Sequence, residues 1–274
     1  MSRRLALAAP FLAPLGAGLI RPAQAQDAGT AARPLRVGVT AGVHAQVLER
    51  VNGIVQPQGL VLKITEFSDF IQPNAALAGG DIDANVYQHQ PFLDQQVKER
   101  GYKLAAVGRT VMTAMAVFGS KAKTVADLPR GARVAIPNDP TNGGRALVLL
   151  AKAGLITLRD GGDFKSSVVD ILTNPRDLRI IELEAAQIAR TLPDVDAGAI
   201  TGNYAVAAGL DPLKDSLVVE TAGPALIRQY CCLVVVRQGD EAKPWAAKLA
   251  GAYADPGLKD WVLQTFKGAV IPGA

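Results

Sequence analysis

The stretch Ala132-Arg-Val-Ala-Ile-Pro-Asn-Asp-Pro-Thr-Asn-Gly-Gly-Arg145, with the apolar run that follows it, decides the fold of this chain. Val134 to Ile136 is a short β-branched run that stops at Pro137 and a cluster of turn residues, which predicts a buried strand. Residues 145–153 are strong helix formers, and Gly154 stands where a left-handed C-cap is expected. We therefore expect a strand, a tight polar turn and a nearly all-apolar helix.

The start of this helix is a candidate binding site. Thr141 or Asn142 can cap it, and the unpaired N–H groups at the positive end of the helix dipole favour an anion. Arg145 falls in the first turn, where the dipole disfavours a cation, and a local rule broken in this way often marks function. The guanidinium fork suits a carboxylate. The alternative interpretation is a solvated surface arginine.

Residues 1–25 have the pattern of a secretory signal. The chain begins Met-Ser-Arg-Arg, continues with a largely apolar run from Leu5 to Ile20, and reaches the Ala-Gln-Ala motif at residues 23–25. Proline and glycine interrupt the apolar run, so it is a poor membrane span. No cysteine lies near the predicted cleavage point, and we therefore expect a periplasmic protein without a lipid anchor.

The charge balance of the mature chain argues against a nucleic-acid partner. Cleavage after Ala25 removes three arginines, so the 29 basic residues fall to 26 against 25 acidic ones. The remaining chain is almost neutral and shows no basic patch of the kind that nucleic acids require. Residues 26–34 are polar and rich in alanine and glycine, and we expect them to be a mobile lead.

Metal, cofactor and catalytic signatures are missing from the sequence. The two cysteines, Cys231 and Cys232, are adjacent, and neighbours in a strand point to opposite faces, so we expect two free and mostly buried thiols. Two histidines give little basis for a metal site. No nucleophile elbow, phosphate-binding loop or zinc-protease motif is present. We predict no catalytic residue, no metal and no cofactor.

Strand and helix patterns alternate along the chain, which predicts α/β architecture with parallel sheets. Two internal similarities support a pair of related lobes: Leu35-Arg-Val-Gly-Val resembles Ala132-Arg-Val-Ala-Ile, and Asp81–Asn85 resembles Val195–Ala199. In such sheets ligands bind beyond the carboxyl ends of the strands, where all four of these segments lead into turns.

Aromatic residues gather in one third of a chain that is only 5% aromatic. Because they stand on strand ends and turns, an apolar slot for a ligand side chain is one interpretation and ordinary core packing is the other. His89 can donate to a ligand or simply bond the backbone of its loop. The aromatic residues in question are Phe67, Phe70, Tyr87 and Phe92.

Several separate blocks resemble the methionine-binding protein family of ABC importers, the MetQ/NlpA type. The resemblance runs from about Leu35 to the C-terminus. The matching blocks are Asp81-Ile-Asp-Ala-Asn-Val-Tyr-Gln-His-Gln-Pro-Phe-Leu-Asp94, Gly101-Tyr-Lys-Leu104, Pro137-Asn-Asp-Pro-Thr-Asn142, Phe67-Ser-Asp-Phe-Ile-Gln-Pro-Asn74 and Glu182-Leu-Glu-Ala-Ala-Gln187. The resemblance implies a two-lobed, periplasmic-binding-protein-like α/β fold in which each lobe is a mostly parallel sheet flanked by helices. We expect lobe 1 to hold residues 35–112 and 230–274, and lobe 2 to hold residues 113–229.

The resemblance also implies roles for individual residues. The methionine side chain would lie among aromatics and an arginine would hold its carboxylate, which assigns ligand binding to Phe67, Phe70, Tyr87, His89, Phe92, Asn142 and Arg145. The family usually has tyrosine where Phe70 stands and asparagine where Thr201 and Cys232 stand. Those asparagines help to bind the ligand's amino and carboxylate groups, so Thr201 and Cys232 would weaken two polar contacts.

The sequence thus predicts a monomeric solute-binding protein that captures L- or D-methionine, or a related apolar carboxylate, and delivers it to a membrane ABC permease. Two alternatives stay open at this stage. One is an exported enzyme on the same fold, and the other is a binding protein that takes no part in transport.

Overall fold

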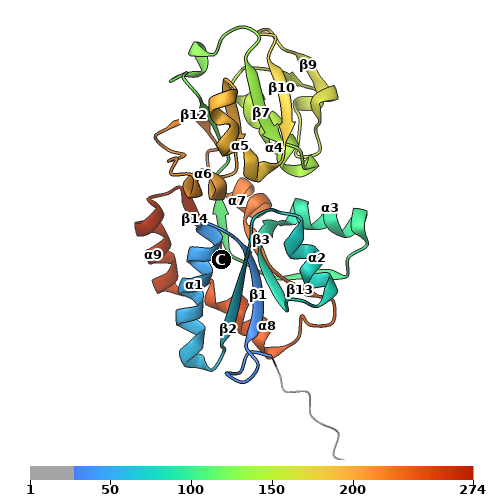
Figure 1. Ribbon diagram of the computed structural model, residues 1–274, viewed down its shortest axis with the longest axis vertical. Coiled ribbons are helices and arrows are strands. Elements are labelled where there is room, and N and C mark those ends of the chain that lie inside the picture. Colours follow the sequence, from blue (N-terminus) through green and yellow to red (C-terminus); the bar gives the residue numbers. More distant parts are fainter. Residues whose placement is uncertain (1–27, 274) are drawn as a thin grey trace, which may run out of the picture.

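Two lobes, each built on a five-stranded sheet, lie one above the other in Figure 1. The computed structural model describes residues 28–273, so the predicted signal segment lies outside the described residues. Residues 28–34 form a turn in which the Gly29 carbonyl accepts a hydrogen bond from Val61 N at 2.8 Å. The predicted mobility of this lead stays a prediction. None of the helices in the described part of the chain is long and apolar enough to span a membrane.

The sheet of lobe 1 has the strand order β2-β1-β3-β13-β4. Its strands are β1 (Leu35–Thr40), β2 (Leu62–Phe67), β3 (Ala84–His89), β4 (Leu104–Arg109) and β13 (Cys232–Arg237). Its helices are α1 (Val43–Val55), α2 (Gln72–Gly79), α3 (Gln90–Arg100), α8 (Pro244–Ala252) and α9 (Pro256–Phe266). Val234 and Val236 face the core beneath α1, α8 and α9, whereas Leu233 and Val235 pack with residues of α2 and α3. Burial on both faces explains why β13 is a continuous apolar run.

The sheet of lobe 2 has the strand order β10-β7-β11-β6-β12. Its strands are β6 (Ala116–Gly119), β7 (Arg133–Pro137), β10 (Arg179–Leu183), β11 (Ala197–Ile200) and β12 (Ser216–Val219). A separate pair, β8 (Thr157–Leu158) and β9 (Ile171–Thr173), extends this lobe. Its helices are α4 (Pro140–Lys152), α5 (Ala185–Thr191) and α6 (Gly202–Ala207). Val134 and Ile136 pack beneath α4, and Ala135 faces the cluster that holds residues of α5 and α6.

The two internal sequence similarities fall on equivalent places in the two sheets. β1 and β7 are each the second strand, and β3 and β11 are each the third. Val37 of β1 pairs with Ile64 and Ala84, just as Val134 of β7 pairs with Ile180 and Ala197. The repeat therefore reflects two lobes with one topology.

The predicted two-lobed α/β fold is present, but each sheet is mixed. β2, β1 and β3 are parallel, as are β10, β7 and β11, whereas β13 and β6 run antiparallel to both of their neighbours. The reason is the connection between the lobes. β6 and β13 are the strands by which the chain enters a lobe from the other one, so they point away from the shared edge where the parallel strands end.

The elements between the lobes are short. β5 (Val111–Thr113) follows β4 and pairs with β14 (Val270–Pro272), while α7 (Pro224–Tyr230) leads back into β13. The sequence patterns do not indicate β12, α7 or β14, because these segments are short and β12 is only half-buried. Gly42, the N-cap of α1, has φ of +96°, and a Cβ there would lie 3.0 Å from the Ala207 Cβ of α6. Glycine at this position permits close contact between the lobes.

Candidate functional site

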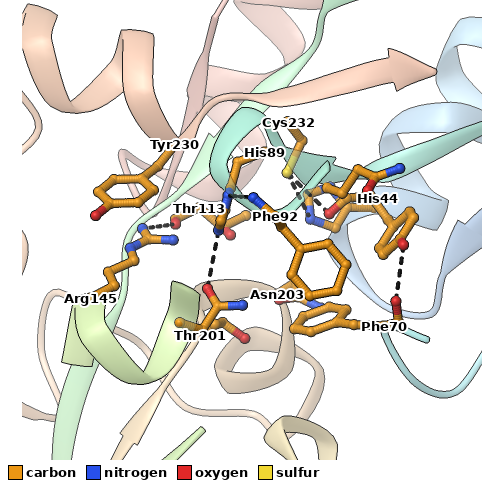
Figure 2. Close-up of a pocket in the computed structure, with 13 residues that line it drawn as sticks. His44, Phe70, His89, Phe92, Thr113, Arg145, Thr201, Asn203, Tyr230 and Cys232 are labelled. Atoms are coloured by element: carbon orange, nitrogen blue, oxygen red, sulfur yellow. Dashed lines mark hydrogen bonds between the residues drawn. The ribbon is translucent and has the colours of Figure 1, made fainter. Parts of the chain in front are cut away.

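A partly open cavity lies between the lobes at the carboxyl ends of their parallel strands (Figure 2). It contains about 350 Å³ of empty space, including the part open to solvent. Both lobes and the connecting elements contribute to its wall. The lining residues are His44, Phe70, Tyr87, Gln88, His89, Phe92, Thr113, Asn142, Arg145, Thr201, Asn203, Tyr230 and Cys232.

Lobe 1 supplies an aromatic wall. The ring centroids of Phe70, Tyr87 and Phe92 lie 6.0 to 6.1 Å from one another. Burial raises the pKa of Tyr87 well above its usual value, so its phenol stays neutral and donates to the Phe70 carbonyl at 2.9 Å. From lobe 2, Tyr204 packs against Phe70 at 4.9 Å between centroids and donates to the Ser68 carbonyl at 3.2 Å. These contacts join the lobes and leave ring faces and edges toward the cavity.

Phe67 does not belong to this wall, which corrects its assignment to the site. Phe67 is the last residue of β2 and packs with the lobe 1 cluster that contains Leu77 and Ile82. A Cβ on Gly38 of the neighbouring strand would lie 2.9 Å from the Phe67 ring. The ring thus packs on the face of the sheet beneath α2, because side chains alternate between the faces of a strand.

His89 and Asn142 bond to each other across the lobe junction. His89 is the N-cap of α3, and its Nδ1 accepts from Phe92 N at 3.2 Å. The neutral ring therefore carries its proton on Nε2, which donates to Asn142 Oδ1 at 3.2 Å. Burial, with help from the charge on Arg145, lowers the pKa of His89 to about 3. His89 and Asn142, which the sequence predicts to bind the ligand, thus lie together at the cavity. They use much of their hydrogen-bonding capacity to bond the two lobes to each other.

The start of α4 is not an open anion site. The helix begins at Pro140, and its N-cap is Asp139 rather than Thr141 or Asn142. The Asp139 carboxylate accepts from Asn142 N at 2.9 Å, from Thr141 Oγ1 at 3.1 Å and from Asn142 Nδ2 at 3.0 Å. Burial raises the pKa of Asp139, although these bonds oppose the rise. A carboxylate from the chain itself thus occupies the positive end of the dipole, because aspartate is among the best N-caps.

Arg145 lies in the second turn of α4 and is buried, with an exposed fraction of 4%, so the alternative of a solvated surface arginine is excluded. Its Nε and Nη2 donate to the two carboxylate oxygens of Glu220 at 2.8 and 2.5 Å, and Nη2 also donates to the Thr113 carbonyl at 3.1 Å. The ring of Tyr230 lies 4.1 Å from the guanidinium carbon (Figure 2). Burial alone would lower the pKa of Arg145, but the charge of Glu220 and its hydrogen bonds raise it above the usual value. Arg145 therefore borders the cavity as one half of an ion pair.

Three polar atoms of the residues that line the cavity are buried and have no partner among the described residues: His44 Nδ1, Thr201 Oγ1 and Asn203 Nδ2. Thr201 is the N-cap of α6, yet its side chain makes no capping bond. Buried polar groups in native proteins are almost always hydrogen-bonded. Thr201 Oγ1 and Asn203 Nδ2 can therefore serve an amino or carboxylate group in the cavity.

Cys232 faces the cavity from the start of β13. Its thiol donates to the Tyr87 carbonyl at 3.2 Å and lies 3.8 Å from His44 Nε2. Burial raises the pKa of Cys232 above its ordinary value and lowers that of His44 to about 4, so both side chains are neutral. Cys231 packs with Met112 and Tyr230, and both cysteines are free, as the sequence indicates. Across residues 28–273 no group of three or more histidine, cysteine, aspartate and glutamate side chains could hold a metal ion.

Sequence reasoning missed several contributors to the site. Asn203 stands two residues after Thr201 in the same turn, and Tyr230 directly precedes the cysteine pair, so proximity to predicted residues could have found both. Gln88 stands between the predicted residues Tyr87 and His89, whereas His44 adjoins no predicted site residue. Glu220 had no local signal, because its importance comes only from its pairing with Arg145. The additional residues are His44, Gln88, Thr113, Asn203 and Tyr230 at the cavity and Glu220 behind it.

Two α/β lobes of equal topology that enclose a small cavity with aromatic and polar walls define a substrate-binding protein of the two-lobed periplasmic class. The family model "NlpA lipoprotein" matches residues 35–274, and the chain belongs to this family. The D-methionine-binding lipoprotein MetQ of Escherichia coli (strain K12) is 40% identical over 242 residues, which cover 87% of this chain and 88% of that protein.

Solved structures agree with this membership. A nutrient-binding protein from Burkholderia cenocepacia bound to methionine is 44% identical with a TM-score of 0.81, covering 86% of this chain and 98% of the other. A periplasmic substrate-binding protein of an ABC transporter from Coxiella burnetii is 39% identical with a TM-score of 0.82, covering 87% and 99%. The prediction of a binding protein rather than an enzyme is confirmed by these relatives.

The prediction of a periplasmic protein without a lipid anchor is contradicted. The matching family is a lipoprotein family, and relatives including MetQ of Escherichia coli and outer membrane lipoprotein 3 of Mannheimia haemolytica are lipoproteins. The prediction rested on the lack of a cysteine near residue 25, within a segment outside the described residues. The lack of a cysteine concerns only a short stretch outside the lobes. The similarity of the lobes to lipoproteins overturns the prediction that was based on it.

Proposed function

We propose that this chain binds free methionine in the cavity between its lobes and presents it to a membrane ABC permease. One observation carries the proposal. The unpartnered atoms Thr201 Oγ1 and Asn203 Nδ2 lie in a cavity that also has an aromatic wall. Methionine has the matching chemistry, since its thioether chain suits aromatic surfaces and its charged end needs polar partners. The methionine-bound relative from Burkholderia cenocepacia supports the same ligand.

In this proposal the polar and apolar ends of the ligand contact different residues. The thioether chain packs against Phe70, Tyr87 and Phe92. The carboxylate accepts from Asn203 Nδ2 and from Arg145 Nη1, which bonds to none of the described residues. The ammonium group donates to Thr201 Oγ1. Cys232 and His89 border the ligand but bond chiefly to the Tyr87 carbonyl and to Asn142.

Ligand entry requires the lobes to separate. We place the division as the sequence predicts it, with residues 35–112 and 230–274 in lobe 1 and residues 113–229 in lobe 2. The hinge then lies at β5 and at the junction of α7 with β13, where the chain passes between the sheets. The protein acts as a monomer, with the permease as its macromolecular partner.

Ligand identity is tested by native mass spectrometry of the purified protein, followed by calorimetry with L- and D-methionine. We expect at least one enantiomer to bind and norleucine, in which a methylene replaces the sulfur, to bind more weakly. Failure of both enantiomers to bind would refute the proposal. A co-purifying mass that corresponds to another compound would also redirect the assignment.

A further inference from the structure

Glu220 is a buried carboxylate directly after β12 that the sequence does not single out. Its side chain is 6% exposed. Met115 N donates to Glu220 Oε2 at 2.8 Å, and Glu220 N donates to the Met115 carbonyl at 3.0 Å. Glu220 is therefore fixed to the segment that joins β5 to β6, which is also a passage between the lobes.

The contacts of Glu220 set the orientation of the Arg145 guanidinium. Both carboxylate oxygens accept from Arg145, through Nε and Nη2, in a bidentate arrangement. Glu220 does not line the cavity between the lobes. It lines a second space behind the Arg145 and Tyr230 side chains. Because the ion pair and the Thr113 carbonyl occupy Nε and Nη2, Nη1 is the nitrogen that remains for a ligand.

We propose that Glu220 is a positioning residue for ligand binding, and this inference rests on the proposed function. Glu220 acts through Arg145 without touching the ligand. A bidentate carboxylate fixes the plane of a guanidinium, whereas a neutral amide can accept only one of its two hydrogen bonds. The carboxylate of Glu220 also balances the buried positive charge of Arg145. The guanidinium is therefore paired even when no ligand is bound.

A double-mutant cycle tests this role, with L-methionine affinity measured by calorimetry. Glu220→Gln keeps the shape of the side chain, and Arg145→Lys keeps the charge but loses the planar fork. We expect each single variant to weaken binding by about tenfold or more, and the double variant to bind no more weakly than Arg145→Lys alone. Glu182→Gln is the matched control, because it removes a carboxylate from an exposed position of the same lobe, and its affinity should equal that of the parent.

The outcomes separate this inference from the proposed function. If the parent does not bind methionine, the proposed function fails. If the parent binds but Glu220→Gln binds equally well, or if the two losses multiply in the double variant, Glu220 does not act through Arg145. Thermal unfolding of the empty variants checks that they fold. Should Glu220→Gln not fold, Glu220→Asp takes its place in the cycle, because it retains the charge while one methylene less withdraws the carboxylate from the fork.

Discussion

The two lobes share one strand order but differ in the side-chain hydrogen bonds made at equivalent positions. His89 ends β3 in lobe 1 and Thr201 follows β11 in lobe 2, and each is the N-cap of the next helix. The His89 side chain accepts from the helix and donates to the opposite lobe, whereas the Thr201 hydroxyl has no partner among the described residues. At equivalent backbone positions, His89 of lobe 1 therefore uses both ring nitrogens in hydrogen bonds, whereas the Thr201 hydroxyl of lobe 2 can still bond to a ligand.

The same difference extends to the cavity walls. Lobe 1 contributes mainly rings, while lobe 2 contributes Arg145, Asn203 and Thr201. The division suggests that lobe 1 recognises the apolar chain of a ligand and lobe 2 its charged end. Single substitutions in either lobe test this division of roles.

The largest effect is expected for Arg145→Ala. Removal of one partner of a buried ion pair leaves Glu220 uncompensated, which costs about 3–5 kcal/mol of unfolding free energy. Methionine affinity should fall by about a hundredfold or more, since a charged partner is lost. Urea unfolding and calorimetry measure the two effects. Addition of Glu220→Gln should restore part of the stability but not the binding, and recovery of binding would show that Arg145 does not contact the ligand.

A smaller effect is expected for Phe70→Ala in lobe 1. The ring contacts Tyr87, Phe92 and Tyr204, so its loss removes apolar surface from the cavity and from the contact between the lobes. Affinity for methionine should fall by about tenfold, given the value of a partly buried aromatic side chain. Phe67→Ala is the matched control, because Phe67 is also half-buried and three residues away but lies outside the cavity. Equal losses in both variants would contradict the assignment of the aromatic wall.

The smallest effect on binding is expected for pH, which distinguishes stability from binding. The pKa values of His44 and His89 are lowered to about 4 and about 3 by burial, below the ordinary 6.5 of the unfolded chain. Between pH 6.5 and pH 4 the unfolded state binds protons that the folded state does not. The free energy of unfolding therefore falls as the pH decreases from 6.5 toward 4. The slope approaches about 1.4 kcal/mol per pH unit for each histidine. Urea unfolding at a series of pH values measures it, and His44→Gln should reduce the slope.

Methionine affinity should stay constant between pH 8 and about pH 5, because both rings are neutral throughout that range in the folded protein. A fall in affinity centred near pH 6.5 would show that one of these histidines is protonated in the binding site. That result would overturn the tautomer assigned to His89.

The sequence predicted most of the fold because its signals are local. The apolar run at Val134–Ile136, the turn after Pro137 and Gly154, with φ of +71°, all appear as expected. Eight of the nine predicted site residues line one cavity, since resemblance to a family carries three-dimensional information that periodicity lacks. Phe67 is the exception, because the face on which a strand-end ring lies depends on the twist and packing of its own lobe.

The order of most strands and helices and the repeated lobe therefore follow from the sequence through patterns among near neighbours, whereas the identity of most cavity residues follows from the family resemblance. The tertiary structure decided how the charges are paired. Arg145 and Glu220 are 75 residues apart, and Asp139 rather than an external anion occupies the start of α4. A buried charge takes whichever partner folding brings within hydrogen-bonding distance, and no local pattern records that partner.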